Sequence, residues 1–281
     1  MADVVYEVDG DQFVATHLAA GPWDPSTQHG GPPAALLAHG MERHEPGWSD
    51  TEGHAVMARV TTEILRPIAV GPVTVEVRTV HQGRRAHRLE ASMHADGKVV
   101  ARGTGLRLVT ADVALPPDLE MSSFDEVPPP PNVEWASPPR WIADKEAWGR
   151  AGGGDLDRWE NFIETCEYRV VEGNWDDPGR CAVWVRIDTD MVEGVGTTPL
   201  MRVVATSDMS AGVGRVLAFD DYIHPNADLN VHLFQYPEGD WIGMRALMWA
   251  AGTGLAMGEA TLYDRGARIG STTQACIVTR R

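Results

Sequence analysis

The chain has 281 residues, 43% of them hydrophobic, which is enough to bury a large core in one domain or in two of about 120–140 residues each. The net charge of −16 argues against nucleic-acid binding, because 40 acidic residues outnumber the 24 basic residues that would contact phosphates. Three scattered cysteines without a CxxC pair argue against a disulfide framework. With no secretory leader and no long apolar run, the sequence predicts a cytoplasmic protein that does not enter a membrane.

The first half of the chain is expected to form a helix followed by antiparallel strands. In "GGPPAALLAHGMERH" (30–44) glycines precede two prolines and an Ala/Leu run, which is typical of a helix start. The stretch "VTVEVRTV" (73–80) alternates apolar and polar residues, as a strand does. "ASMHADGKVVARGT" (91–104) has Asp and Gly between two such runs and therefore indicates a hairpin.

A proline-rich segment divides the chain. It contains "ADVALPPDLEMSSFDEVPPPPNVEWASPPR", which lacks periodicity and is typical of a linker over the surface. Short helical turns are expected later in the same segment. The sequence thus predicts an N-terminal unit (1–112), a linker (113–160) and a C-terminal unit (161–281).

The second half repeats the first 169 residues later. "ATLYDRGARIGSTT" (260–273) aligns without a gap with 91–104, and 242–249 alternates as 73–80 does. "TTPLMRVVATSDMSAG" (197–212) corresponds to the first helix, with Thr197 or Thr198 as a candidate N-cap. We therefore expect an α+β fold built from two copies of one unit.

Four stretches in this order resemble a known family: "HGGPPAALLA", "ILRPIAVGPVTVEVRTVHQGRRAHRLEA", "HPNADLNVHL" and "GSTTQACIV". They are similar to acyl-CoA thioesterase II-like proteins, of the thioesterase-like double-hotdog group. The resemblance covers nearly all of the chain except the linker. It implies a double hotdog, with two curved antiparallel sheets that each wrap a central helix.

The same resemblance implies a site in the second unit, where an Asp, a Ser or Thr and a Gln hold the hydrolytic water. By position these are Asp208, Asn226 and Gln274. Asn226 departs from the family pattern, since it offers an amide where a hydroxyl is expected. The corresponding positions of the first half hold other groups: His39, Met57 and Gly105. A single site per chain is therefore expected.

Thioester hydrolysis needs a positioned water, a proton acceptor and donors for the oxyanion. Asp208 would take the proton of the water, which is worth roughly 10²–10⁴-fold, while Gln274 and Asn226 would orient the water. Backbone N–H groups at a helix start would stabilise the oxyanion.

Two basic or glycine-rich stretches supply candidate substrate contacts. His29, Gly30 and Gly31 resemble the substrate loop of smaller phenylacetyl-CoA-type hotdog thioesterases, and we expect this loop to face Asp208 across the two units. Arg84 and Arg85, in "QGRRAHR", are candidates for contacting the phosphates of CoA.

Other chemistries find little support. GxSxG, GxxxxGK[ST], a well-placed GxGxxG and HExxH are all absent, so neither a nucleophile elbow nor a metal or other cofactor is expected. Two alternatives stay open: an enoyl-CoA hydratase using Asp220, Asp221 and His224, and a non-catalytic acyl-CoA- or lipid-binding module. Free sheet edges would also allow a homodimer of double hotdogs.

Overall fold

The computed structural model describes residues 4–44, 55–114, 116, 159–174, 177–219, 221–265 and 267–281. Most of the linker expected at 113–160, with its short helical turns, lies outside these residues. No helix among them is long and apolar enough to cross a membrane.

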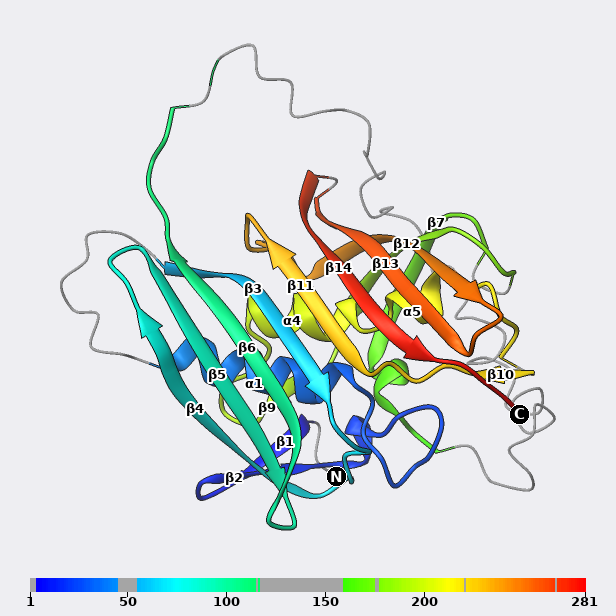
Figure 1. Cartoon of the computed structure of the whole chain (residues 1–281), viewed down its shortest axis with the longest axis horizontal. Coiled ribbons are helices and arrows are strands. Elements are labelled where there is room, and N and C mark those ends of the chain that lie inside the picture. Colours follow the sequence, from blue (N-terminus) through cyan, green and yellow to red (C-terminus); the bar gives the residue numbers. More distant parts are fainter. Residues whose placement is uncertain are drawn as a thin grey trace.

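The two halves of the chain form similar series of elements (Figure 1). The first half forms β1 (Val4–Asp9), β2 (Gln12–Ala15), the 3-10 helix η1 (His17–Ala19), α1 (Gly31–Arg43), β3 (Ala55–Ile64), β4 (Pro72–Gln82), β5 (Ala86–Ala95) and β6 (Lys98–Val109). The second half forms η4 (Phe162–Thr165), β7 (Cys166–Glu172), β8 (Cys181–Ile187), β9 (Asp190–Val192), α4 (Pro199–Ser207), α5 (Ser210–Val213), β10 (Tyr222–Ile223), β11 (Asp228–Leu233), β12 (Trp241–Ala251), β13 (Leu255–Asp264), β14 (Ala267–Ile277) and β15 (Thr279–Arg280).

Thirteen strands of the described chain form one sheet, in the order β7-β8-β12-β13-β14-β11-β3-β6-β5-β4-β2-β1-β9. Apart from β9, each half contributes six strands in mirrored order, and the halves meet where β3 pairs with β11 antiparallel. The two separate sheets expected from the resemblance are thus joined edge to edge, because each half leaves one strand edge whose backbone groups need partners.

The join between the halves falls on equivalent residues of the repeat. Thr61 pairs with Asn230, and the Thr61 hydroxyl donates to Asn230 Oδ1 at 2.8 Å. These two residues are 169 positions apart, the offset found in the sequence. An approximate two-fold axis therefore passes close to this pair and relates the two halves.

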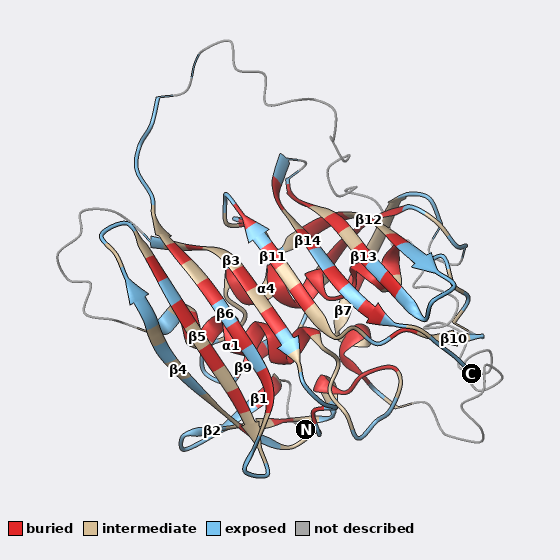
Figure 2. Ribbon diagram, viewed as in Figure 1, coloured by how far each residue is buried: buried red, intermediate tan, exposed pale blue. Residues whose placement is uncertain are grey.

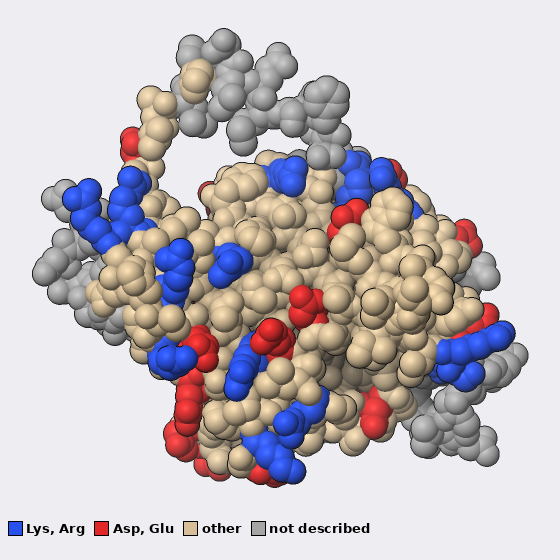
Figure 3. Space-filling view, viewed as in Figure 1, with Lys and Arg blue, Asp and Glu red and all other residues tan. Residues whose placement is uncertain are grey.

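The helices lie on one face of the sheet and contribute many of the buried residues of the core (Figures 1 and 2). α1 packs against α4 and against β3–β6, so residues 31–41 are buried except Gly40. The expected alternation on β12 is confirmed: Ile242, Met244 and Met248 are buried, whereas Trp249 is exposed. On the face of the molecule shown in Figure 3, Lys and Arg are scattered in several small groups.

The second central helix is interrupted. Sequence 197–212 suggested one continuous helix, but α4 ends at Ser207, Asp208 is its C-cap, and α5 starts at Ser210. Asp208 consequently lies at a helix end inside the protein. A carboxylate is unfavourable there, because the carbonyl end of a helix carries partial negative charge.

Candidate active site

A pocket of about 600 Å³ lies where the loop before α1 meets the break between α4 and α5. Residues 21–30, the end of β3 with the turn after it, and residues 223–227 contribute to its walls. Its apolar side chains include Trp23, Ile64, Ile163, Met209, Phe219 and Ile223. Among its polar residues are His29, Asp208, Asn226 and Gln274. The pocket thus takes groups from both halves of the chain.

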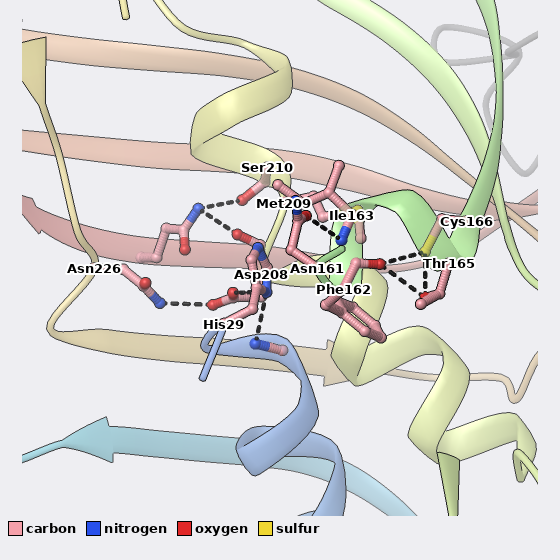
Figure 4. Close-up of polar contacts among 12 residues, drawn as sticks. His29, Asn161, Phe162, Ile163, Thr165, Cys166, Asp208, Met209, Ser210 and Asn226 are labelled. Atoms are coloured by element: carbon pink, nitrogen blue, oxygen red, sulfur yellow. Dashed lines mark hydrogen bonds and ion pairs between the residues drawn. The ribbon is translucent and has the colours of Figure 1, made fainter. Parts of the chain in front are cut away.

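Asp208 is the buried acid of this pocket, with a side chain only 3% exposed. Asn226 Nδ2 donates to Asp208 Oδ1 at 2.6 Å, and His29 Nδ1 lies 3.1 Å from Asp208 Oδ2 (Figure 4). The backbone N–H of Gly31 donates to the same carboxylate. The start of α1 therefore offsets the unfavourable position of Asp208 at the end of α4, since the N-terminus of a helix carries partial positive charge.

The start of α1 has few backbone donors, and one of them, Gly31 N–H, donates to Asp208. Its N-cap, Gly30, makes no side-chain cap, and Pro32 and Pro33 have no N–H. Gly31 donates to His29 Nδ1 at 3.1 Å as well as to Asp208, whereas Gly30 N–H has no partner among the described residues. A Cβ on Gly30 would lie 2.8 and 2.9 Å from the two carboxylate oxygens. Only glycine fits this approach.

The Gln274 side chain forms hydrogen bonds at the break between α4 and α5. Its Nε2 donates to the backbone oxygen of Asp208 at 3.2 Å and to Ser210 Oγ at 3.0 Å, and the residue is 2% exposed. Its Oε1 is buried without a hydrogen-bond partner in the described part of the chain. Gln274 thus contacts the backbone of Asp208 through Nε2, and the contact with water that the resemblance implies stays a prediction.

Burial shifts the two titratable groups of the site toward their neutral forms. It raises the pKa of Asp208, an effect opposed by His29, Asn226 and the Gly31 N–H. It lowers the pKa of His29, an effect opposed by the Asp208 charge. A carboxyl with a raised pKa close to an apolar pocket is typical of a functional acid or base.

The equivalent position, where the start of α4 meets the end of α1, is closed. Thr198 caps α4, because its Oγ1 accepts from Met201 N at 3.2 Å. The same hydroxyl donates to Glu42 Oε2 at 3.3 Å, and burial raises the pKa of Glu42. Met201 N–H, a backbone donor of this helix start, is thus engaged within the protein.

Methionine and tyrosine side chains fill the position that matches Gln274. Gly105 stands there, and a Cβ on it would collide with Met57 and lie 2.9 Å from Met41 Sδ. Tyr236 OH accepts from Met57 N at 2.7 Å and bonds to the Glu42 carboxylate. Met41 and Met57 therefore occupy the space next to Gly105.

The structure brings six of the expected site residues together and leaves two apart. Asp208, Asn226, Gln274, His29, Gly30 and Gly31 gather at the pocket. Arg84 and Arg85 are exposed in the turn between β4 and β5. Because Ala86 and Val56 both pair with Leu108, that turn lies at the opposite end of β3 from Ile64, roughly 25 Å away at ~3.3 Å per residue.

The pocket also contains residues that do not belong to the expected thioesterase site. Arg66, within the quoted "ILRPIAV" stretch, is exposed and lines the pocket. Trp23, Phe219 and His224 form an aromatic wall with ring centroids 5.2–5.6 Å apart. Within the described ranges, no three His, Cys, Asp or Glu side chains gather as a metal site requires.

We expect Tyr236→Phe to lower the free energy of unfolding by about 1–3 kcal/mol, because it leaves the Met57 N–H without its acceptor. Tyr222→Phe is the matched control, since no described residue bonds its hydroxyl, and its effect should stay within about 0.5 kcal/mol. Chemical denaturation measures both. Equal effects of the two substitutions would contradict a stabilising role for the hydrogen bond between Tyr236 and Met57 N–H.

Asp208→Asn should stabilise the fold increasingly as the pH rises. The folded pKa of Asp208 lies above its unfolded value, so its protonated form stabilises the fold below the unfolded pKa. That contribution is lost as the pH rises through the folded pKa. The Asn variant has no such titration. Denaturant unfolding across pH 4–8 measures the difference, with Asp96→Asn, in the exposed turn before β6, as control. A difference that stays constant with pH would contradict the raised pKa.

Solved structures show the fold. A TesB protein of Mycobacterium avium subsp. paratuberculosis is 20% identical with a TM-score of 0.60, covering 98% of this chain and 96% of that one. The acyl-CoA thioesterase II TesB2 of Mycobacterium marinum is 13% identical with a TM-score of 0.62, over 99% and 96%. A conserved hotdog-fold protein of unknown function from Alicyclobacillus acidocaldarius is 17% identical with a TM-score of 0.65, over 98% and 95%. The chain therefore has a hotdog fold.

Family comparison covers most of the sequence. None of the curated proteins compared matches it. Residues 19–108 match the acyl-CoA thioesterase N-terminal domain, and residues 125–278 match the acyl-CoA thioesterase C-terminal domain. The two matches follow each other in the order of the repeat. The chain therefore belongs to the acyl-CoA thioesterase family.

Proposed function

We propose that the protein hydrolyses an acyl-CoA thioester to the free acid and CoA, with Asp208 as general base. The observation that carries this proposal is the buried Asp208 carboxylate in contact with the uncapped start of α1, beside a largely apolar pocket. Membership of the acyl-CoA thioesterase family supports it. We also propose that the chain is a double hotdog in which only the second helix carries a site.

In this mechanism Asp208 takes a proton from water while the water oxygen attacks the thioester carbonyl. Asn226 holds the carboxylate through Oδ1, which fixes the direction of its other oxygen. Gly30 N–H, which no described residue engages, donates to the oxyanion. Gln274 contributes by holding the backbone at the helix break, because its amide already donates to Asp208 O and Ser210.

The apolar walls of the pocket suit the acyl group. Ile64, Ile163 and Met209 supply branched or flexible apolar surface close to Asp208, and Trp23 and Phe219 supply aromatic surface. Arg66, which is exposed and lines the pocket, is better placed than Arg84 or Arg85 to meet the phosphates of CoA. The acyl group would therefore enter the apolar part, with CoA toward Arg66.

The two alternatives differ from this proposal in what they release. For a hydratase, His224 would need a carboxylate partner. Its ring stacks on Phe219, and it has no ion pair with a carboxylate among the described residues. Asp220 lies outside the described residues. A non-catalytic module would bind acyl-CoA without turnover. A thiol-trapping dye with a panel of acyl-CoAs identifies hydrolysis, since only hydrolysis releases free CoA. Loss of enoyl-CoA absorbance without thiol release would identify a hydratase, and saturable binding with neither signal would identify a binding module.

Asp208→Asn should lower the turnover of acyl-CoA by roughly 10²–10⁴-fold, because it removes the proton acceptor and keeps the shape. In the unmodified protein, activity should rise with pH through the raised pKa of Asp208, so its acid limb should lie above that of an ordinary carboxylate. Initial rates of CoA release measure both. Asp96→Asn, in a distant exposed turn, is the control. Near-normal turnover of Asp208→Asn would exclude the mechanism.

Gly30→Ala should lower turnover by about 10–100-fold, because its Cβ would displace the Asp208 carboxylate. Gly252→Ala is the matched control, since a Cβ at that position meets nothing within 4 Å. CoA release and thermal unfolding are measured for both variants. Unchanged turnover of Gly30→Ala in a folded protein would show that the close approach has no role in catalysis.

A further inference from the structure

The hydrogen bonds of His29 identify which ring nitrogen carries the proton. Gly31 N–H donates to Nδ1 at 3.1 Å, so Nδ1 offers a lone pair. In a neutral imidazole the other nitrogen, Nε2, then carries the hydrogen. Burial lowers the pKa of His29, which favours this neutral form. The Gly31 contact and the lowered pKa together favour a neutral His29 ring with its N–H on Nε2 at rest.

The contact between His29 and Asp208 becomes more favourable when Asp208 is protonated. Nδ1 and Asp208 Oδ2 are 3.1 Å apart, and an ionised carboxylate and a lone-pair nitrogen are both acceptors. Between them, only Gly31 N–H supplies a hydrogen, shared by the two. Once Asp208 has taken a proton, its O–H can donate to Nδ1. The pair thus attracts more strongly during the reaction than before it, which is the condition for lowering a barrier.

The Nε2 side of the ring is available to the substrate. No described residue forms a hydrogen bond with Nε2, and the side chain, 11% exposed, lines the pocket. Phe162 packs against the ring, with centroids 5.4 Å apart, and fixes its plane. Hydrolysis of a thioester expels a thiolate, which must gain a proton to leave as CoA thiol. If no other group donated the proton, Asp208 would have to deliver it to the sulfur from the other side of the carbonyl carbon.

We propose that His29 passes the proton from Asp208 to the leaving thiolate. This step rests on the proposed hydrolase function. The water oxygen bonds to the carbonyl carbon while one water proton moves to Asp208 Oδ2. The C–S bond breaks, Nε2–H is transferred to sulfur, and the Asp208 proton moves to Nδ1. The product acid then protonates Nε2, and the proton on Nδ1 leaves through Asp208 to solvent, which restores the starting tautomer.

His29→Gln tests the transfer, because the amide keeps an acceptor for Gly31 N–H and has no proton to relay. With acyl-CoA, kcat/KM should fall roughly 10²–10³-fold. With the same acyl group on an aryl thiol of low pKa, whose thiolate leaves without protonation, the fall should be about tenfold or less. Asp208→Asn should lower kcat/KM for both thioesters by similar factors. Equal losses on both thioesters for His29→Gln would reduce His29 to a positioning residue and overturn the proposal.

A solvent-isotope measurement tests the same step on acyl-CoA itself. In mixtures of H₂O and D₂O, kcat/KM of the unmodified protein should follow a curved line, because at least two protons move together. His29→Gln should give a straight line, and its thermal unfolding should stay near that of the unmodified protein. A straight line for the unmodified protein would contradict the relay. If Asp208→Asn keeps full turnover, the hydrolase mechanism itself fails, which is a different result from either outcome for His29.

Discussion

The structure depends on one electrostatic arrangement: a buried carboxylate at the end of one helix meets the start of another. Asp208 ends α4, where the helix carries partial negative charge, and it is buried. The start of α1 supplies the compensation, through Gly31 N–H and the close approach of Gly30. Neither half could build this site alone, because the acid and Asn226 come from the second half, whereas the helix start with Gly31 N–H comes from the first. The edge-to-edge sheet that joins β3 to β11 holds the two halves in this position.

Duplication followed by divergence explains why the two helix ends differ. The approximate two-fold axis at Thr61 and Asn230 creates two equivalent positions, each with one helix start facing the end of the other. At one of these positions, the backbone N–H groups of the helix start are left for Asp208 and the pocket. In the other, Thr198 caps its own helix, Glu42 binds this hydroxyl, and methionines occupy the space. The closed end thus engages its polar groups within the protein, whereas the open end keeps a carboxylate whose ionisation is opposed by burial.

Local patterns predicted the elements well, and contacts between distant segments less well. The hairpins of both halves followed from a gap-free repeat with Asp and Gly at the turn, and both are present as β5–β6 and β13–β14. The fused sheet did not follow, because pairing between two strand edges leaves no mark in either strand. The distance of Arg84 from the pocket also could not be inferred, since a charge cluster does not indicate which end of the sheet it occupies. The hydrogen bonds of Gln274 depend on side-chain direction at the helix break, which no sequence spacing specifies.

The raised pKa of Asp208 connects stability to chemistry. Burial favours the neutral carboxyl, so ionisation of Asp208 costs the folded protein stability. The same burial makes the ionised group a stronger proton acceptor than an exposed carboxylate, because a raised pKa brings its basicity closer to the working pH. His29, neutral and in contact, offers a place for the proton once it is taken. A better-solvated acid would give a more stable fold and a weaker base, so the site keeps its carboxylate buried against the start of α1.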